Sequence, residues 1–315
     1  MQVPQPKPIK SDLDWFARAA EGGNPYAQFN LGMMYRNGEG VEQDDAEAVR
    51  WLLCAACQRL AFAQNHLGSM YYQGHGVEQS DTLAAYWFRL AAEQGDPSAQ
   101  QNLGDMYRLG RGVPHDPSTA VAWYFKAAGQ DSASAQRMLG ECYLHGQGVD
   151  ADPGLALAWL RRAAQVGEAE AELSLGLMHR NGQGLDASEA QAVYWFRRAA
   201  GKGHPAAQRL LGLCCLDGLG MTRDPNAARV WLQRAAEQGD ASAQNKLGVL
   251  FAEGRDVRQG DAEAVRRYRM AAEQGHALAR YNLGGMLNSG RGVARDSVRA
   301  YMWMLLAPRA RHRAG

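Results

Sequence analysis

Histidine and serine are residue types that could serve here as bases, metal ligands or nucleophiles, but their spacing forms no catalytic motif. The eight histidines occupy different positions, with no His-Glu-x-x-His motif and no paired ligand spacing, so the sequence predicts no zinc site. No serine has a lysine three positions later, and the Walker lysine motif and the Gly-x-Ser-x-Gly elbow are absent. We therefore expect no enzyme, no catalytic residue, no metal ligand and no cofactor.

The cysteines also argue against redox chemistry. There are five, an odd number that does not follow the repeat described below and gives no disulfide framework: Cys54, Cys57, Cys142, Cys214 and Cys215. Cys142 and Cys214 occupy a position that methionine fills in other repeats, so we expect the cysteines to be small core residues. Cys54 and Cys57 are one helical turn apart without a matching pair nearby, which does not favour a metal site.

The composition favours a folded protein whose partner is neither nucleic acid nor a membrane. Its 34 basic and 33 acidic side chains leave a net charge of +1, and no stretch approaches the roughly 20 apolar residues of a membrane span. The first ten residues contain three prolines and no apolar run, so no signal peptide is predicted. A cytoplasmic location is the simplest expectation, with the periplasm as the alternative if a leader has been removed.

A Leu-Gly pair recurs every 36 residues, eight times without slippage. The pairs begin at Leu31, Leu67, Leu103, Leu139, Leu175, Leu211, Leu247 and Leu283. Such a period predicts that each unit is one supersecondary element whose apolar face is buried by its neighbours. We expect an all-α superhelical solenoid over 11–308, with a half repeat at 11–23 and eight full repeats from residue 24. A flexible segment 1–10 precedes it and a basic tail 309–315 follows it.

Each repeat has room for two helices, called helix A and helix B below. In the first full repeat we expect helix A at about 25–37 and helix B at about 45–58. Proline follows a capping residue at the start of helix A in Asn24-Pro25, and at the start of a later helix B in Asp116-Pro117. A Gly-x-Gly after helix A supplies positive φ at the helix end and a tight turn.

Two further sets of positions keep one residue type. Alanine fills every copy of the sites that begin at Ala27, Ala48 and Ala55, so that helices can approach closely. All eight tryptophans occupy one position of helix B, from Trp15 to Trp303. We expect them to form a packing ladder rather than eight ligand sites.

The repeat pattern resembles a known family. Ala-x-x-x-Leu-Gly-x-x-Tyr-x-x-Gly-x-Gly-Val over 27–41, followed by Asp-x-x-x-Ala-x-x-Trp-x-x-x-Ala-Ala over 44–56, is similar to the Sel-1-like repeat (SLR), a relative of the tetratricopeptide repeat (TPR). The resemblance covers residues 11 to about 308. It implies a right-handed α/α superhelix that acts as a scaffold or adaptor for a partner protein or peptide, in bacteria often in signalling, envelope or host-interaction pathways. Some relatives have been linked to penicillin binding or hydrolysis, which is an alternative function.

The resemblance also selects candidate partner-binding residues, because helix A lines the concave groove of the TPR superhelix. Mapped through Leu31-Gly32, the inward positions are those of Tyr26, Phe29, Met33 and Arg36 and their copies. The candidates are Tyr26, Phe29, Arg36, Phe62, Asn65, Tyr72, Gln101, Arg108, Arg137, Arg180, Arg209, Asn245, Tyr281 and Asn288. Aromatic, arginine and amide side chains in this order suggest a peptide-sized site.

The arginines of this groove are not equivalent. Arg108 and Arg137 each have an acid three or four positions away on the same helix, which can neutralise them without any partner. Arg180 and Arg209 have no acid at the corresponding sites of their own helices. We therefore expect these two to be the better candidates for binding a carboxylate of a partner.

Two repeats depart from the pattern. In the seventh, Asp256 replaces the second loop glycine, Gly260 the capping Asp and Arg267 the tryptophan, which suggests a soft joint that could act as a hinge. The last helix carries Met304, Leu305 and Leu306 at its end, where the Leu305 and Leu306 sites are arginine pairs in middle repeats. From residue 280 onward there are seven arginines and one acid. This end therefore suggests an end contact through which the chain self-associates or docks a partner, as an oligomeric regulatory subunit would.

Overall fold

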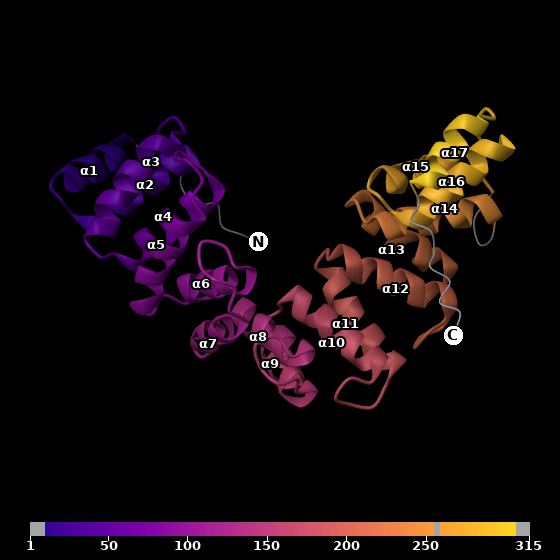
Figure 1. The fold of residues 1–315 in the computed structure, drawn as a ribbon, viewed down its shortest axis with the longest axis horizontal. Helices are drawn as coiled ribbons and strands as arrows, with labels where there is room; N and C mark the ends of the chain where they lie inside the picture. Colours follow the sequence, from indigo (N-terminus) through magenta and orange to yellow (C-terminus); the bar gives the residue numbers. More distant parts are fainter. Residues whose placement is uncertain (1–9, 255–258, 307–315) are drawn as a thin grey trace. The chain divides into compact units, whose positions relative to one another are not determined.

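The structure is a computed structural model that describes residues 10–254 and 259–306. Over these residues it contains 17 helices joined by turns and no strand, which confirms the all-α class. Helices A and B of each repeat form a closely packed hairpin, and within each of two compact units consecutive hairpins pack on one another (Figure 1).

The units are Met1–Val166 and Gly167–Gly315. The first contains α1 (Lys10–Glu21), α2 (Pro25–Asn37), α3 (Asp45–Cys57), α4 (Ala61–Gln73), α5 (Asp81–Glu93), α6 (Pro97–Leu109), α7 (Pro117–Ala128), α8 (Ala133–His145) and α9 (Pro153–Gln165). The second contains α10 (Ala169–Asn181), α11 (Glu189–Gly201), α12 (Pro205–Asp217), α13 (Pro225–Glu237), α14 (Ala241–Glu253), α15 (Asp261–Glu273), α16 (Ala277–Ser289) and α17 (Ser297–Leu305). Even-numbered helices are A helices and odd-numbered helices are B helices.

Not every part of the predicted organisation can be followed in the structure. One continuous solenoid over 11–308 stays a prediction, because the two units are described separately. Helix α1 begins at Lys10, the last residue of the predicted flexible segment 1–10. The rest of that segment, the tail 309–315 and the loop residue Asp256 lie outside the described residues.

Helix ends form where the capping residues predict them. The Asn24 side chain accepts hydrogen bonds from the backbone N–H groups of Tyr26 and Ala27, both at 3.0 Å, and Pro25 opens the helix. At its other end Gly38 adopts φ 68°, and its N–H bonds to the carbonyl of Met34. A left-handed glycine that returns its N–H to the last turn is the usual way to end a helix.

The glycine of each Leu-Gly pair is a point of close contact between helices A and B. A Cβ atom on Gly104 would lie 2.6 Å from Cε1 of Tyr124, and one on Gly176 would lie 2.5 Å from the ring of Phe196. Each contacting side chain directly follows the ladder position on helix B. The eight are Leu52, Phe88, Tyr124, Leu160, Phe196, Leu232, Tyr268 and Met304. These residues, rather than the tryptophans, fill the centre of each hairpin.

The tryptophans lie at the seams between repeats. Trp15 is 63% exposed, and the other seven are half-buried. Trp87 packs against a core cluster formed by helix B of the preceding repeat, which contributes Leu52, and helix A of its own repeat, which contributes Leu67, and Trp123 does the same one repeat later. The tryptophans therefore help to pack one hairpin on the next, as expected of a packing ladder, but they lie at the edge of the core rather than within it.

The second loop glycine also holds neighbouring repeats together. A Cβ on Gly76 would lie 2.2 Å from the carbonyl oxygen of Asp45, and one on Gly112 would lie 2.1 Å from that of Asp81. The loop after one helix A therefore presses on the first residue of the preceding helix B. This contact adds a role to the tight turn that the sequence predicts.

A ladder of buried glutamines, which the sequence analysis did not single out, joins the repeats through hydrogen bonds. Gln64 is 2% exposed; its Nε2 donates to the carbonyl of Ala56 at 3.0 Å, and its Oε1 accepts from Nε2 of Gln94 at 2.6 Å. The buried members with this pattern are Gln28, Gln64, Gln100, Gln208 and Gln244, and the second donors are Gln58, Gln94, Gln130, Gln238 and Gln274. The ladder satisfies polar groups that burial would otherwise leave unpaired.

One rung of this ladder is charged. Glu172 is fully buried, and its Oε1 accepts from Nε of Arg198 and Nζ of Lys202, both at 2.8 Å. Nζ of Lys202 also donates to the carbonyl of Gly167 at 2.8 Å, as Gln58 and Gln130 do to the equivalent glycines in other repeats. The charged pair thus occupies the same geometry as the neutral rungs.

We predict that Gly176→Ala lowers the midpoint of thermal unfolding while Gly285→Ala does not. Gly176 has no room for a methyl group beside the Phe196 ring, so overpacking should cost about 1–3 kcal/mol. Gly285 lies in helix α16 with nothing near the position of its Cβ, and alanine there should add roughly 0.5–1 kcal/mol. Differential scanning calorimetry measures both. Equal shifts in the two variants would contradict the close-contact role of Gly176.

We predict that Lys202→Met costs more stability than Gln238→Met. The first removes a charge that faces the buried Glu172 carboxylate, and the second removes only a neutral amide donor. Because Lys202 is itself partly exposed, we expect a loss of about 2 kcal/mol against about 1 kcal/mol. Urea unfolding measures the difference. The double change Glu172→Gln with Lys202→Gln should restore a neutral rung and recover near wild-type stability, and a continued loss would refute the ladder.

Candidate partner-binding surface

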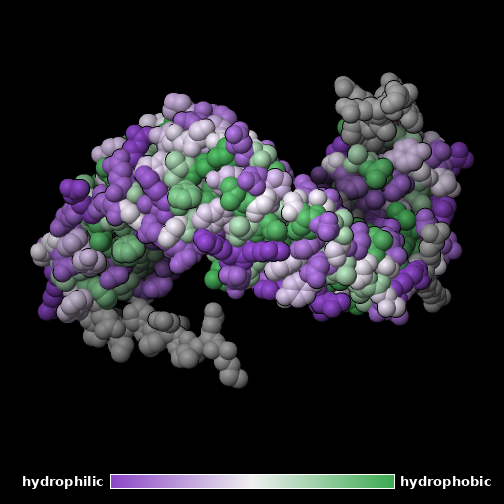
Figure 2. All heavy atoms as spheres, turned by 90° about the horizontal axis from the view of Figure 1, so that it is seen from below, coloured by the Kyte–Doolittle hydropathy of each residue, from purple (hydrophilic) through white to green (hydrophobic). Residues whose placement is uncertain are grey.

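The A helices carry the residues that the sequence nominates for partner binding. Tyr26, Phe62 and Tyr281 are 63%, 58% and 62% exposed, and Asn288 is exposed as well. The other ten candidates are half-buried. On the molecular face drawn in Figure 2, apolar side chains lie mixed with polar ones. A surface of this kind offers many small contacts rather than one large apolar patch.

At the N-terminal end, Phe29 and Arg36 meet a histidine that the sequence analysis did not select. The rings of Phe29 and His66 are 5.4 Å apart, and Nη1 of Arg36 donates to Nδ1 of His66 at 3.2 Å. Burial, together with the Arg36 charge, lowers the pKa of His66, against a smaller opposing effect of Asp96. The neutral imidazole is the form that accepts this hydrogen bond.

Asn65 bonds to a residue that lines a small cleft between helices α4 and α6, called cleft 1. Nδ2 of Asn102 donates to Oδ1 of Asn65 at 2.9 Å, and both amides are half-buried. The cleft has a volume of about 210 Å³ and is lined by Tyr72 and Asn102, among others. Tyr72 is held by Arg111, whose guanidinium lies 4.0 Å from its ring centroid. Arg111 also forms a two-fold hydrogen bond with Asp81 at 2.8 and 2.7 Å.

The same arrangement recurs five repeats later, between helices α14 and α16 of the second unit. In this cleft 2, Nδ2 of Asn282 donates to Oδ1 of Asn245 at 3.0 Å, and Arg291 bonds to Asp261 at 3.3 and 2.7 Å. Each of these residues occupies the repeat position of its counterpart in cleft 1. Cleft 2 is larger, about 410 Å³, because Ala252 stands where cleft 1 has Tyr72.

In the middle of the surface, acids on the same helices neutralise the charges of the candidate arginines. Nη2 of Arg108 lies 3.1 Å from Oδ1 of Asp105, which also accepts from the Tyr124 hydroxyl at 2.7 Å. Burial and the Asp105 charge raise the pKa of Tyr124. Nη1 of Arg137 bonds to Oε1 of Glu141 at 2.7 Å. The expectation that these helical neighbours can satisfy each other is thereby confirmed.

Arg180 and Arg209, which lack an acid at the corresponding sites of their own helices, differ in what the next repeat supplies. Nε of Arg209 donates to Oδ2 of Asp240 at 3.0 Å, so its acid comes from the capping residue of the next helix A. Arg180 lies over the Phe196 ring at 5.9 Å and forms no hydrogen bond or ion pair with any residue that the structure describes. Of these two candidates, Arg180 is therefore the one that has charge to offer a partner. Neither Gln101 nor Asn288 has a side-chain hydrogen bond within the described ranges.

The expected end contact at the C-terminus divides in two. Met304 is half-buried and packs toward helix α16, because a Cβ on Gly284 would lie 2.7 Å from its Cγ; its part in an end contact stays a prediction. Leu305 and Leu306 are 63% and 54% exposed, and the Leu306 carbonyl accepts from Arg280 at 2.6 Å. Self-association through these two leucines stays a prediction.

The thiols fall into two groups. Cys142, Cys214 and Cys215 are buried, and burial raises the pKa of both Cys142 and Cys214 to about 11, as fits core residues. Cys54 and Cys57 are exposed, so expecting them in the core is wrong. In the part of the chain that the structure describes, no three His, Cys, Asp or Glu side chains gather as a metal site would require.

Within each unit the packed hairpins define a helical-repeat fold of the α-solenoid class. The chain belongs to the Sel1 repeat family, whose model matches nine segments: 13–24, 25–60, 61–96, 97–132, 133–168, 169–204, 205–240, 241–276 and 277–307. None of the helices described here combines the length and apolar character needed to cross a membrane.

Two solved structures show the same family likeness. One is c5321 from uropathogenic Escherichia coli, a protective antigen displaying an SLR fold, with 34% identity and a TM-score of 0.79 over 94% of this chain. This chain spans 63% of that protein. The other is a Sel1 repeat protein from Oxalobacter formigenes, with 30% identity and a TM-score of 0.71 over 78% of this chain and 96% of that one. Comparison with curated proteins gives no match.

We predict that His66 makes the folded chain less stable as the pH falls from 7.5 to 5.0. Its pKa is lowered in the folded state, so the folded chain binds fewer protons there than the unfolded chain. The stabilisation is complete above the ordinary value of 6.5 and is lost as the pH falls through the folded value. Thermal unfolding followed by circular dichroism should show a smaller pH dependence for His66→Asn. The exposed turn residue His75 provides the control, His75→Asn, and the prediction fails if the two variants behave alike.

Proposed function

We propose that this protein is an interaction scaffold that binds an extended segment of a partner protein along its A helices. Membership of the Sel1 repeat family and the hairpin fold support a scaffold that acts through protein contacts. The segment would contact the A-helix surface of one unit at cleft 1, of the other at cleft 2, or both. No catalytic step is part of this role.

The recurrence of the cleft is the observation that carries the proposal. Asn102, which lines cleft 1, bonds to Asn65, and Asn282, which lines cleft 2, bonds to Asn245; the two hydrogen bonds are the same and lie at the same repeat positions. Packing of the solenoid does not require asparagine there, because other repeats have residues such as Leu173 and Leu210 at these positions. Two independent copies of a polar pair on an accessible surface support a shared ligand type.

The chemistry of the pair suits a peptide backbone. One amide hydrogen and one carbonyl oxygen are used between the two side chains, which leaves the carbonyl oxygen of the donor asparagine and the NH₂ group of the acceptor asparagine. An extended chain presents N–H and C=O groups in alternation. A partner backbone can therefore donate to one asparagine and accept from the other, while its side chain enters the adjoining cleft.

Arg180 adds a preference for acidic partners. The Arg180 side chain is half-buried, and no acid among the described residues pairs with its guanidinium. A carboxylate of the partner can therefore form an ion pair with it. Charge-assisted hydrogen bonds of this kind are roughly twice as strong as neutral ones. The relative described as a protective antigen of uropathogenic Escherichia coli supports a host-interaction or envelope setting, rather than the penicillin-directed alternative, which lacks its serine and lysine pair.

Co-purification with the tagged full chain, followed by mass spectrometry and calorimetry on the captured partner, tests the proposal. Asn102→Ala and Asn282→Ala should each weaken binding by about fivefold to tenfold, since each removes about one net hydrogen bond, and Arg180→Ala by about tenfold or more. The matched control is Asn226→Ala, an exposed asparagine on a B helix. Binding that is unchanged in the Asn102 and Asn282 double variant would refute the proposal.

A further inference from the structure

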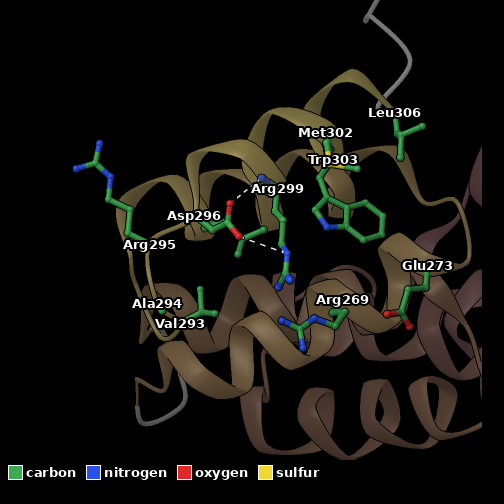
Figure 3. Close-up of a pocket in the computed structure, with 11 residues that line it drawn as sticks. Arg269, Glu273, Val293, Ala294, Arg295, Asp296, Arg299, Met302, Trp303 and Leu306 are labelled. Carbon is green, nitrogen blue, oxygen red and sulfur yellow. Dashed lines mark hydrogen bonds and ion pairs between the residues drawn. The ribbon is translucent and has the colours of Figure 1, made fainter.

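A cavity outside the A-helix surface lies between the seventh and the last repeat. It has a volume of about 520 Å³ and is bordered by helices α15 and α17 and the loop before α17. Its apolar wall includes Leu287, Val293 and Trp303, and arginines stand at its edge. In Figure 3 the side chains of Arg269 and Arg299 extend into the space between the two helices, whereas Arg295 points away from it.

A ring that other repeats place at this site is missing from the cavity. The third residue after the Leu-Gly glycine is tyrosine in the first four full repeats and leucine, Leu287, in the last. The tyrosines are Tyr35, Tyr71, Tyr107 and Tyr143. A leucine is too short to fill the space that a phenol ring would occupy beside the tryptophan of the same repeat.

The third repeat displays the filled version of the same site. Tyr107 packs with Val113 and Trp123 against the core, and its hydroxyl accepts a hydrogen bond from Nη2 of Arg89 at 3.0 Å. Five repeats later these four positions are Leu287, Val293, Trp303 and Arg269. The last repeat thus retains the walls and the arginine of the tyrosine site but lacks the tyrosine.

The arginine that would have met the hydroxyl is left without a partner. Arg269 forms no hydrogen bond or ion pair over residues 10–254 and 259–306, whereas Arg299 is paired with Asp296 at 3.3 Å. Three arginines and two acids line the cavity, which leaves one positive charge in excess around it, although Arg295 points away from the space itself. It therefore has an apolar wall for a ring, a free donor for a hydroxyl, and a charge that attracts acidic surroundings.

We propose that this cavity binds a tyrosine side chain that a partner protein presents within an acidic segment. The phenol ring takes the place that Tyr107 occupies in its own repeat, and its hydroxyl accepts from Arg269. Acidic residues beside the tyrosine face Arg269 and Arg299. The site lies on the B-helix side, so it is separate from clefts 1 and 2 and does not depend on what they bind.

Calorimetry on the full chain with the probe peptide acetyl-Glu-Asp-Glu-Tyr-Glu-Asp-amide tests this assignment. We expect the tyrosine peptide to bind at least tenfold more tightly than the same peptide with alanine. A phenylalanine peptide should fall between them, because it retains the ring but loses the hydrogen bond to a charged donor. Equal binding of the tyrosine and alanine peptides, or no binding of either, would overturn the proposal.

Leu287→Tyr is the decisive variant, since it rebuilds the ring that four other repeats contain. We expect it to abolish binding of the tyrosine peptide without lowering the midpoint of thermal unfolding. Undiminished binding by a folded Leu287→Tyr chain would refute the proposal. Arg269→Gln gives a second test that leaves the core intact: it should weaken the tyrosine peptide about tenfold and remove its advantage over the phenylalanine peptide. An advantage that survives in this variant would also count against the site.

The reciprocal change Tyr107→Leu should open an equivalent cavity beside Arg89, and we expect it to raise the binding stoichiometry of the tyrosine peptide from one to two. A stoichiometry that stays at one in the folded variant would overturn the role given to the missing ring. A further variant ends the chain at Leu306. If it binds the peptide more than tenfold tighter than the full chain, residues 307–315 rather than a partner occupy the cavity, and the proposal is refuted.

Discussion

The fold depends on how closely helix B approaches helix A at the glycine of each Leu-Gly pair. A side chain on Gly176 would enter the ring of Phe196, so the two helices of a hairpin can meet at this distance only when that position is glycine. The second loop glycine fixes the next distance, because Gly112 presses on the carbonyl of Asp81 in the preceding repeat. With both spacings fixed, the outer side chains of successive A helices come within hydrogen-bond distance, as Asn102 does of Asn65.

Most of the fold could be predicted because its determinants are local in sequence. Asn24 and Pro25 predict a helix start, and Gly38 predicts its end, from the conformations that these residues prefer. The 36-residue period then carries the same conclusions to the other repeats. The pairing of Arg137 with Glu141 could be predicted in the same way, since both lie on one helix. The residue that fills the centre of each hairpin could not be predicted. Tryptophan is the constant residue of the pattern, whereas the residue that follows it varies, as in Leu52 and Phe88.

The missed parts of the binding surface all involve contacts between repeats. Arg209 lacks an acid on its own helix but meets Asp240, the cap of the next one, and comparison along a single helix cannot reveal that. His66 is one of eight scattered histidines in the sequence, and only the stacking of α4 on α2 places it beside Arg36. Glu172 and Lys202 replace a pair of glutamines in the ladder, and this replacement can be recognised in the sequence only once the ladder is known. A sequence repeat therefore predicts each hairpin better than the surface that several hairpins form together.

The ladder of buried amides has a consequence for how the chain acquires its structure. Its side-chain hydrogen bonds join residues 30 positions apart, as in Gln94 with Gln64 and Gln130 with Gln100. A fold dominated by such short separations has low contact order and can form from local nuclei. During synthesis each hairpin that leaves the ribosome meets a finished neighbour on its N-terminal side. The buried polar groups are thus paired as the chain grows, and the nascent protein need not wait for its C-terminus before it is protected from aggregation.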